Sequence, residues 1–325
     1  MVLVTNPVVG LICCVYCCLC WGSWANTQKL VTNKNWKFPL FYWDYIFGFF
    51  LTALVGMLTL GGASIGEFTW HSVGYAMLGG LIWNFANIFL TAANSIAGMS
   101  VGFPIGGGLG WVGGVVFNYF VGGFTGNKTL LWIGLVLAVS AMIFCAVSYS
   151  RLTSSQKKTP LTGIIFAIIS GFGFAFFYGL VIKGIDPAYV SGGVGTLTPY
   201  AAVFFFALGV LLSTPVINGV AMRHSVEGKC SMKDYVSNGD ARTHLIGMLG
   251  GFIWMSGMVI SFMSAGAQVN KAVAYALSNA SPLIAMIWGV FIWKEFKGAP
   301  KGTNKYVAAM FLSFLAALVI ITLSN

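Results

Sequence analysis

The chain has 325 residues, of which 58% are hydrophobic and 7% charged, and its formal net charge is +10 at pH 7. An ordinary soluble domain carries about 25% charged residues, so this composition excludes a soluble protein and predicts one that lies in the lipid bilayer. The lysines and arginines lie in short connections between apolar runs, which is typical of loops beside anionic lipid. No nucleic-acid partner is therefore expected.

The apolar runs predict an all-α integral membrane protein, because a backbone in lipid must satisfy its own hydrogen bonds. About 20 apolar residues cross the hydrocarbon core. By this measure the sequence predicts ten transmembrane helices, near residues 8–28, 41–62, 72–95, 99–122, 129–149, 160–182, 195–218, 244–266, 272–293 and 304–323. No basic segment precedes the first run, so we expect a first span there and not a cleaved signal peptide.

The ten predicted spans divide into two repeats of five helices, residues 1–150 and 160–325, joined by a short cytoplasmic linker at 151–159. Because five is an odd number, the second repeat would enter the membrane from the opposite face, which makes an inverted repeat. Fourteen of the 17 lysines and arginines fall on one side of the predicted topology. The positive-inside rule makes that side cytoplasmic. We therefore expect both termini outside the cytoplasm, in a plasma membrane, or the inner membrane if the source is bacterial.

The first span contains five of the seven cysteines, at positions 13, 14, 17, 18 and 20. We expect them to be packing residues, because zinc sites draw cysteines from turns and rarely from one lipid-buried helix. No metal site, cofactor or catalytic residue is expected, and the chain is not predicted to be an enzyme. The three histidines, His71, His224 and His244, lie near loops and apart from one another in the sequence.

A short motif in the third span is repeated later in the chain. Gly79–Trp83 reads Gly-Gly-Leu-Ile-Trp, and Gly250–Trp254 reads Gly-Gly-Phe-Ile-Trp, 171 residues further on. In both halves a second apolar run follows, which suggests one unit used twice. The fourth span has a glycine at every fourth position from Gly102 to Gly114, and this spacing predicts close packing against another helix.

The third span also carries polar residues on one helical face. Asn84, Asn87, Thr91 and Asn94 are spaced by three, four and three residues. Such a row is costly against lipid but tolerable against a water-filled cavity or a neighbouring helix. We expect it to form one wall of a solute-binding cavity, and the alternative is a set of hydrogen bonds between helices.

The eighth and ninth spans supply a second group of candidate solute-binding residues: Trp254, Ser261, Ser264, Gln268, Lys271 and Asn279. Pro282 lacks a backbone donor and would free a carbonyl inside the ninth span, as in the broken helices that line transporter sites. For Lys271 the alternative is a side chain that extends to the outer interface. Trp83 and Trp254 lie deep in their spans and are candidates to stack on a solute, with helix packing as the alternative.

None of the seven acidic residues stands near the middle of a predicted span, where a proton-coupled carrier usually has one. Asp44 and Glu295 lie at cytoplasmic span ends and are the candidates for ion coupling. The alternative for Asp44 is an interfacial salt bridge with Lys29 or Lys37. For Glu295 it is a structural contact at the end of a helix.

Several of these segments together resemble a known family. The segments are Trp21–Trp24, Tyr42–Tyr45, Gly79–Asn87, Gly98–Gly102, Ser281–Leu283 and the pair Glu295-Phe296. Their order and spacing resemble the drug/metabolite transporter superfamily. Within it, they resemble the ureide permease branch and the related L-rhamnose–proton symporter and glucose/ribose porter branches. The resemblance covers nearly the whole chain.

This resemblance implies a ten-helix carrier with a central cavity, working by alternating access. It also implies uptake of small, mostly neutral polar solutes, sugars in one branch and ureides or oxo-pyrimidines in another, driven by H⁺, with Na⁺ as the other possible coupling ion. Plant ureide permeases carry a long central loop with a phosphate-loop motif, which this chain lacks, so no nucleotide control is expected. The alternatives are an exporter of the same fold, against which the polar row argues, and a non-transporting membrane scaffold or receptor.

Overall fold

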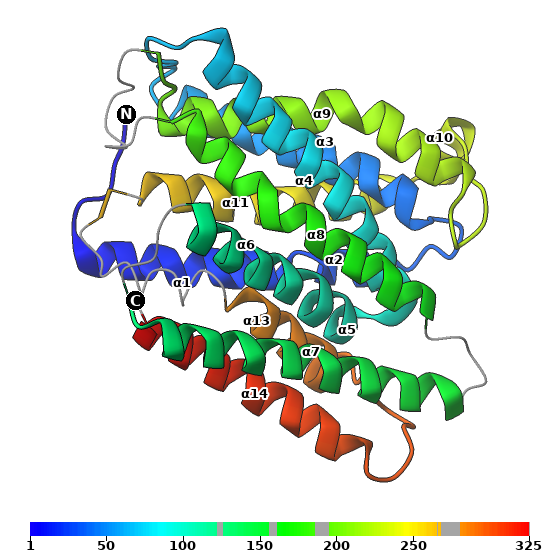
Figure 1. The fold of residues 1–325 in the computed structure, drawn as a ribbon. Coiled ribbons are helices and arrows are strands. Elements are labelled where there is room, and N and C mark those ends of the chain that lie inside the picture. The colour runs from blue at the N-terminus through cyan, green and yellow to red at the C-terminus, as the bar shows by residue number, and fades with distance from the viewer. Residues whose placement is uncertain (122–125, 156–160, 186–194, 265, 268–279, 325) are drawn as a thin grey trace. The chain divides into compact units, whose positions relative to one another are not determined.

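The computed structural model describes residues 1–121, 126–155, 161–185, 195–264, 266–267 and 280–324. Within these ranges the regular structure is helical, apart from two isolated β-bridges that join Phe68 to Gly195 and Ile185 to Leu197. The predicted all-α class is therefore confirmed for the described residues (Figure 1).

Eight of the described helices are long and apolar enough to cross a membrane, so the chain is a multi-pass membrane protein. They correspond to the second to eighth and to the tenth predicted spans. The helix in the first span, Pro7–Ser23, has 17 residues, and the described part of the ninth span, Ser281–Ile292, is also shorter than the others. Residues 272–279 of the ninth span lie outside the described part of the chain, and the count of ten remains a prediction.

Side-chain caps start several of these helices, where the first backbone N–H groups lack partners within the helix. The Asn6 side chain accepts hydrogen bonds from Val8 N (2.9 Å) and Val9 N (3.2 Å) at the start of α1 (Pro7–Ser23). The Asp240 carboxylate accepts one from Thr243 N (2.7 Å) at the start of α11 (Ala241–Met263).

The chain divides into two compact units, each of which draws on both halves of the sequence. The first unit comprises Met1–Ile88 and Phe177–Val269, and the second comprises Phe89–Phe176 and Asn270–Asn325. This division follows spatial contacts and leaves the predicted sequence repeat untested.

The first unit contains α1, α2 (Asn26–Leu30), α3 (Phe38–Leu58), the larger part of α4 (Trp70–Ala97), the end of α8 (Leu161–Lys183), α9 (Pro199–Arg223), α10 (Met232–Asn238) and α11. The second unit contains the end of α4, α5 (Met99–Gly102), the π-helical segment η1 (Phe103–Gly107), α6 (Gly108–Val121), α7 (Lys128–Ser155), the larger part of α8, α13 (Ser281–Ile287), the π-helical segment η2 (Trp288–Ile292) and α14 (Thr303–Ser324).

In the first unit, α3 packs on α11 and α9 packs on α4 through glycines that meet a neighbouring backbone. A Cβ added to Gly48 of α3 would overlap the carbonyl oxygen of Met248 of α11. A Cβ added to Gly209 of α9 would overlap the carbonyl oxygen of Met77 of α4 in the same way. Gly48 and Gly209 are 161 positions apart, and Met77 and Met248 are 171 apart, as are the two copies of the glycine motif.

The repeated motif makes the reciprocal contacts. Gly251 of α11 lies against the carbonyl oxygen of Tyr45 of α3, and Gly80 of α4 lies against that of Phe206 of α9. Tyr45 and Phe206 are again 161 positions apart. In lipid, helices associate by close packing because solvent supplies no hydrophobic drive, so small residues set the contact. Two helix pairs in this unit therefore share one packing arrangement.

The tryptophans that end the two copies of the motif meet each other inside the first unit. The ring centroids of Trp83 and Trp254 are 4.5 Å apart. Phe49 of α3 packs on both, at 4.8 Å and 5.1 Å, and Trp21 of α1 stacks on Trp254 at 5.9 Å. These rings occupy the place where the glycines bring the helices together.

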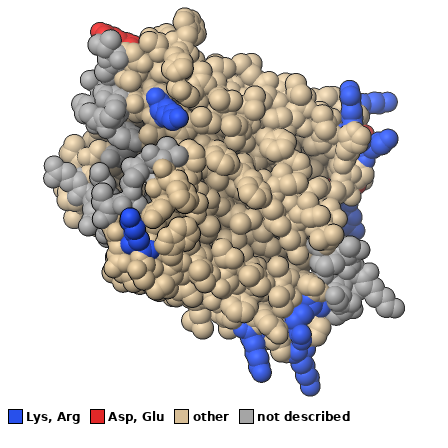
Figure 2. Space-filling view, viewed as in Figure 1, with Lys and Arg blue, Asp and Glu red and all other residues tan. Residues whose placement is uncertain are grey.

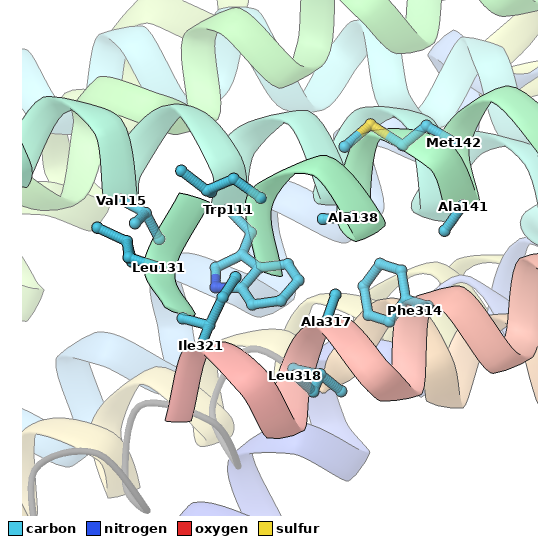
Figure 3. Close-up of a cluster of buried hydrophobic side chains, with 11 residues drawn as sticks. Trp111, Val115, Leu131, Ala138, Ala141, Met142, Phe314, Ala317, Leu318 and Ile321 are labelled. Atoms are coloured by element: carbon cyan, nitrogen blue, oxygen red, sulfur yellow. The ribbon is translucent and has the colours of Figure 1, made fainter. Parts of the chain in front are cut away.

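In the second unit, α7 and α14 run side by side and α6 packs on them (Figure 1). Trp111 of α6 points toward Phe314, Ala317 and Ile321 of α14, and its ring lies 5.5 Å from that of Phe314 (Figure 3). The evenly spaced glycines of the fourth predicted span pack on α8: Gly106 lies against Ala167 O, Gly110 against the Phe174 side chain and Gly114 against Ala175 O. The predicted close helix packing at these glycines is confirmed.

One face of the molecule is mostly uncharged (Figure 2). Figure 2 shows one face, on which the atoms of residues other than Lys, Arg, Asp and Glu cover most of the area. Large apolar side chains such as Phe47, Val216 and Leu312 are exposed. Lipid is the solvent that makes this surface stable.

We expect Gly251→Ala to destabilise the protein, because its Cβ would overlap a backbone oxygen that cannot rotate away. Overpacking of this kind costs about 1–3 kcal/mol. Thermal melting of the protein in detergent, followed by size-exclusion chromatography, measures the loss. Gly219→Ala in α9 is the control, because no heavy atom lies within 4 Å of its added Cβ. Equal melting of the two variants would contradict the packing role of Gly251.

Candidate functional site

The polar row predicted in the third span lies on α4 and is buried. Asn84, Asn87 and Thr91 have no exposed surface, and Asn94 is 5% exposed. All four side chains therefore face protein, which is where a buried amide or hydroxyl can find partners. Asn84 and Asn87 belong to the first unit, and Thr91 and Asn94 to the second.

Asn84 forms a complete set of hydrogen bonds with neighbouring helices. Its Oδ1 accepts a hydrogen bond from the Tyr42 hydroxyl of α3 at 2.7 Å. Its Nδ2 donates to Val210 O (3.1 Å), Ser213 Oγ (2.8 Å) and Thr214 Oγ1 (3.0 Å) of α9. Asn84 therefore forms hydrogen bonds between helices, which was the alternative to a cavity wall for this polar row.

Asn87 belongs to the same network, because its Nδ2 donates to the Tyr42 hydroxyl at 3.4 Å. Tyr42 is fully buried and so joins two asparagines, one helical turn apart, to α3. No pattern in the sequence singles out Tyr42, Ser213 or Thr214 as partners of the polar row. Single hydroxyls in apolar spans carry no local signal, and their pairing with α4 depends on contacts 42 to 130 positions apart.

Asn94 differs from Asn84. In the part of the chain that the structure describes, neither its Nδ2 nor its Oδ1 has a hydrogen-bond partner. Its Oδ1 lies against Gly102 of α5, where an added Cβ would overlap it. On the next turn of the same glycine face, Gly106 lies near the hydroxyl of Ser170 of α8, which is also buried and without a described partner. A buried polar group left unpaired costs about 1–3 kcal/mol, so a hydrogen-bonding partner for either side chain would lower the free energy.

Trp83 and Trp254 are brought together, as described above. Ser261 is half-buried on α11, and its carbonyl accepts a hydrogen bond from the Ser264 hydroxyl at 3.1 Å. This part of α11 faces α1: the Cys17 thiol donates to Gly257 O at 3.1 Å, so the cysteine-rich span packs on α11. Gln268, Lys271 and Asn279 lie outside the described residues.

Asp44 lies inside a cluster of polar and aromatic side chains. Its Oδ1 accepts a hydrogen bond from the Tyr235 hydroxyl of α10 at 2.5 Å. The same oxygen lies 2.9 Å from Nδ1 of His244 of α11. The ring of Trp36 packs on both Tyr235 (5.3 Å) and His244 (5.0 Å).

The partners of Asp44 differ from those considered in the sequence. Lys37, one of the two expected salt-bridge partners, donates instead to Lys229 O at 2.6 Å. His244, which the sequence presented as an isolated residue near a loop, is the partner instead. The approach of α10 and α11 to α3 brings it there, 200 positions along the chain from Asp44.

Glu295 joins two segments of the second unit. Its carboxylate accepts from Met99 N (2.9 Å), Ser100 N (2.8 Å) and Ser100 Oγ (2.5 Å) at the start of α5. Gly98 precedes them with φ +88°, a backbone conformation that favours glycine, and a Cβ there would meet the carboxylate. These distances fit a structural contact of Glu295 at a helix end, which was the alternative to a role in ion coupling.

A groove of about 700 Å³ runs along α4 and α9 in the first unit, between residues that include Leu81, Phe85, Leu212 and Val216. Its lining is almost entirely apolar, and these four side chains are exposed. Such a groove suits lipid chains and offers little to a polar solute. The buried polar groups of α4 are therefore better candidates for solute contacts.

The chain is similar in sequence to known membrane transport proteins. A sequence model described as "Ureide permease" matches residues 138–324. Ureide permease 1 of Arabidopsis thaliana is 24% identical, over 97% of this chain and 97% of its own. The probable glucose uptake protein GlcU of Staphylococcus aureus (strain MRSA252) is 24% identical, over 93% and 94%. A solved crystal structure, 13% identical, covers 95% of this chain and 98% of its own with a TM-score of 0.53, and so shares the fold.

We expect Tyr42→Phe to lower thermal stability, because it removes the donor to Asn84 Oδ1 and the acceptor of Asn87 Nδ2. Leaving buried polar groups short of a partner costs about 1–3 kcal/mol. The matched control is Tyr306→Phe, which keeps the ring that lies 5.5 Å from Arg151 Cζ. Melting of the purified protein measures both, and a Tyr42→Phe variant as stable as the control would contradict the network.

Proposed function

Because the chain belongs to the ureide permease family, we propose that it is a secondary active transporter that imports a small, neutral, polar solute together with protons. Its relatives carry the names of ureide permeases and of sugar and glucose uptake proteins. We therefore assign the solute to the ureides, the nucleobase-like oxo-pyrimidines or the sugars. All three classes carry several hydrogen-bond donors and acceptors and no net charge.

The observation that carries this proposal is the buried polar face of α4. An asparagine amide offers two donors and two acceptor lone pairs, and Asn94 uses none of them within the described residues. A solute with neighbouring N–H and C=O groups, or with hydroxyls, would complete its hydrogen bonds. Asn87 and Thr91 lie on the same face of the helix, and Ser170 lies on α8 beside the same row of glycines.

An inverted repeat working by alternating access is part of the proposal. The reciprocal contacts at Gly48, Gly209, Gly80 and Gly251 support it, because corresponding positions in two related halves should pack in corresponding ways. The meeting of Trp83 with Trp254 supports it as well, since residues close to a symmetry axis contact their own counterparts. Solute would then be held by one set of side chains that open alternately to the two sides of the membrane.

Transport into proteoliposomes tests the proposal. Purified protein is reconstituted, a pH gradient with the acidic side outside is imposed, and entry of radiolabelled allantoin, uracil and glucose is followed. We expect accumulation of at least one solute that collapses when a protonophore dissipates the gradient. Accumulation driven only by a sodium gradient would correct the coupling ion, and expulsion of solute toward the acidic side would indicate an exporter. A protein that moves none of the three in either direction would contradict the proposed solute class.

We expect Asn94→Ala to weaken solute binding without weakening the fold. Loss of hydrogen bonds worth about 1–1.5 kcal/mol raises the KM for uptake roughly tenfold. Thermal stability should stay the same or rise, because an unpaired buried amide is removed. Ser148→Ala is the control: Ser148 is equally buried, and its hydroxyl bonds only to Phe144 O of its own helix, at 2.8 Å, among the bonds described. A fall in stability with an unchanged KM would contradict a binding role.

A further inference from the structure

We propose that the carboxyl of Asp44 is the group that carries the coupled proton, and that His244 is the residue through which the proton enters and leaves. This inference rests on the proposed transport function and adds to it the site of coupling. The sequence presented Asp44 as the best candidate for ion coupling and Glu295 mainly as a structural contact at a helix end, and no sequence pattern connected either of them to a histidine.

The geometry around Asp44 suits a group that gains and loses a proton. Its side chain is 3% exposed, and one oxygen, Oδ2, is buried and without a hydrogen-bond partner in the described part of the chain. A buried carboxylate with an unpaired oxygen is costly as an ion and less costly as a neutral acid. The other oxygen contacts a titratable ring at 2.9 Å. Asp44 therefore has one oxygen that no described donor holds and another in contact with a group able to exchange a proton.

His244 provides a route between this buried oxygen and water. Its side chain is 29% exposed, whereas that of Asp44 is 3% exposed. Histidine is the side chain whose charge ordinarily changes near neutral pH. A hydronium ion gives a proton to Nε2 of the neutral imidazole, which leaves water and imidazolium, and the Nδ1 proton then passes to Asp44 Oδ1. This leaves a neutral carboxylic acid and a neutral imidazole with its proton on Nε2, and release reverses these steps.

The other groups that face the pair keep the proton between Asp44 and His244. On α10, burial raises the pKa of the Tyr235 hydroxyl above its usual range, and the bond to Asp44 adds to the rise, so Tyr235 stays a neutral donor. Before α11, the backbone N–H of Thr243 holds the pKa of Asp240 below its usual value, so Asp240 stays charged near His244 and Arg242. Trp36, whose ring packs on His244, carries no charge.

The same geometry favours a proton over a sodium ion. A sodium ion requires several oxygen ligands that converge on one point. Asp44 Oδ1 is already engaged by a hydroxyl donor and an imidazole nitrogen, which leaves no such set among the described residues.

Glu295, by contrast, is suited to a fixed structural role. Its oxygens accept from Met99 N, Ser100 N and Ser100 Oγ, and backbone N–H groups such as the first two cannot become acceptors. Protonation would break bonds that position the start of α5.

The site of protonation connects directly to the helix contacts that hold the solute face. Gly247 of α11 packs on Asp44, and Gly251, one turn further, packs on Tyr45, the next residue of α3. Tyr42, on the same helix, holds Asn84 and Asn87. Neutralising Asp44 weakens its attraction to His244, and so loosens a contact between α11 and α3 within one helical turn of Tyr42, the residue that holds Asn84 and Asn87 in the first unit.

Asp44→Asn tests the proposal, because the amide keeps the shape and the acceptor oxygen but cannot carry a proton. We expect the variant to lose accumulation driven by a pH gradient, while exchange of labelled for unlabelled solute across the membrane continues and no longer depends on pH. His244→Gln, in which Asp44 is unchanged, should shift or flatten the pH profile of solute uptake. The control is Glu227→Gln: this carboxylate accepts a hydrogen bond from Phe38 N, near Asp44 in the chain, and its replacement should leave the pH profile unchanged.

The outcomes separate the two proposals. A wild-type protein that moves no solute would contradict the transport function itself. If the wild type is driven by protons and Asp44→Asn still accumulates solute with the same pH dependence, Asp44 is not the coupling site. Loss of exchange together with loss of thermal stability in Asp44→Asn would assign it a structural role. If that variant does not fold, an unchanged pH profile in both His244→Gln and Tyr235→Phe would equally overturn the inference.

Discussion

Contacts between glycines and the backbone of a neighbouring helix determine how the helices of the first unit pack. In lipid, helices associate mainly by close approach of this kind. At Gly48, Gly80, Gly209 and Gly251 two helices come too near for any side chain to intervene. The positions of the other groups follow from these contacts. The two motif tryptophans meet because the glycines four and three positions before them draw their helices inward. Asn84, one residue beyond Trp83, is brought within reach of the α9 hydroxyls for the same reason.

Polar groups within this apolar frame fall into two kinds. Asn84 and Glu295 are saturated by several hydrogen bonds and hold segments in place. Asn94, Ser170 and one oxygen of Asp44 are buried without described partners. Saturated groups stabilise one arrangement of helices, whereas unsaturated groups gain free energy when something is added to them. A protein that binds and releases a solute and an ion needs both kinds, since the first maintains the frame and the second makes binding favourable.

The sequence was sufficient for the helical membrane fold, most of the span positions and the importance of the two glycine motifs, because each depends on local composition or spacing. It also located the polar face of α4, since a period of three and four residues is visible without any partner. It could not distinguish Asn84 from Asn94, because that difference depends on hydroxyls of α3 and α9 far away in the chain. The pairing of Asp44 with His244 was missed for the same reason: the histidine looked isolated until α11 was placed against α3.

The offset between corresponding positions changes from 161 residues at Gly48 and Gly209 to 171 at the repeated motif. Ten extra residues therefore separate α9 from α11, and this connection contains α10, the helix that supplies Tyr235 to Asp44. If the two halves arose by gene duplication, the inserted residues added α10, and with it the Tyr235 contact to Asp44, to the second half only. The corresponding stretch in the first half, from Gly48 of α3 to Gly80 of α4, is ten residues shorter than that from Gly209 to Gly251. Two identical inverted halves would make the two membrane faces of a protein equivalent. An insertion in one half alone is enough to make those faces differ.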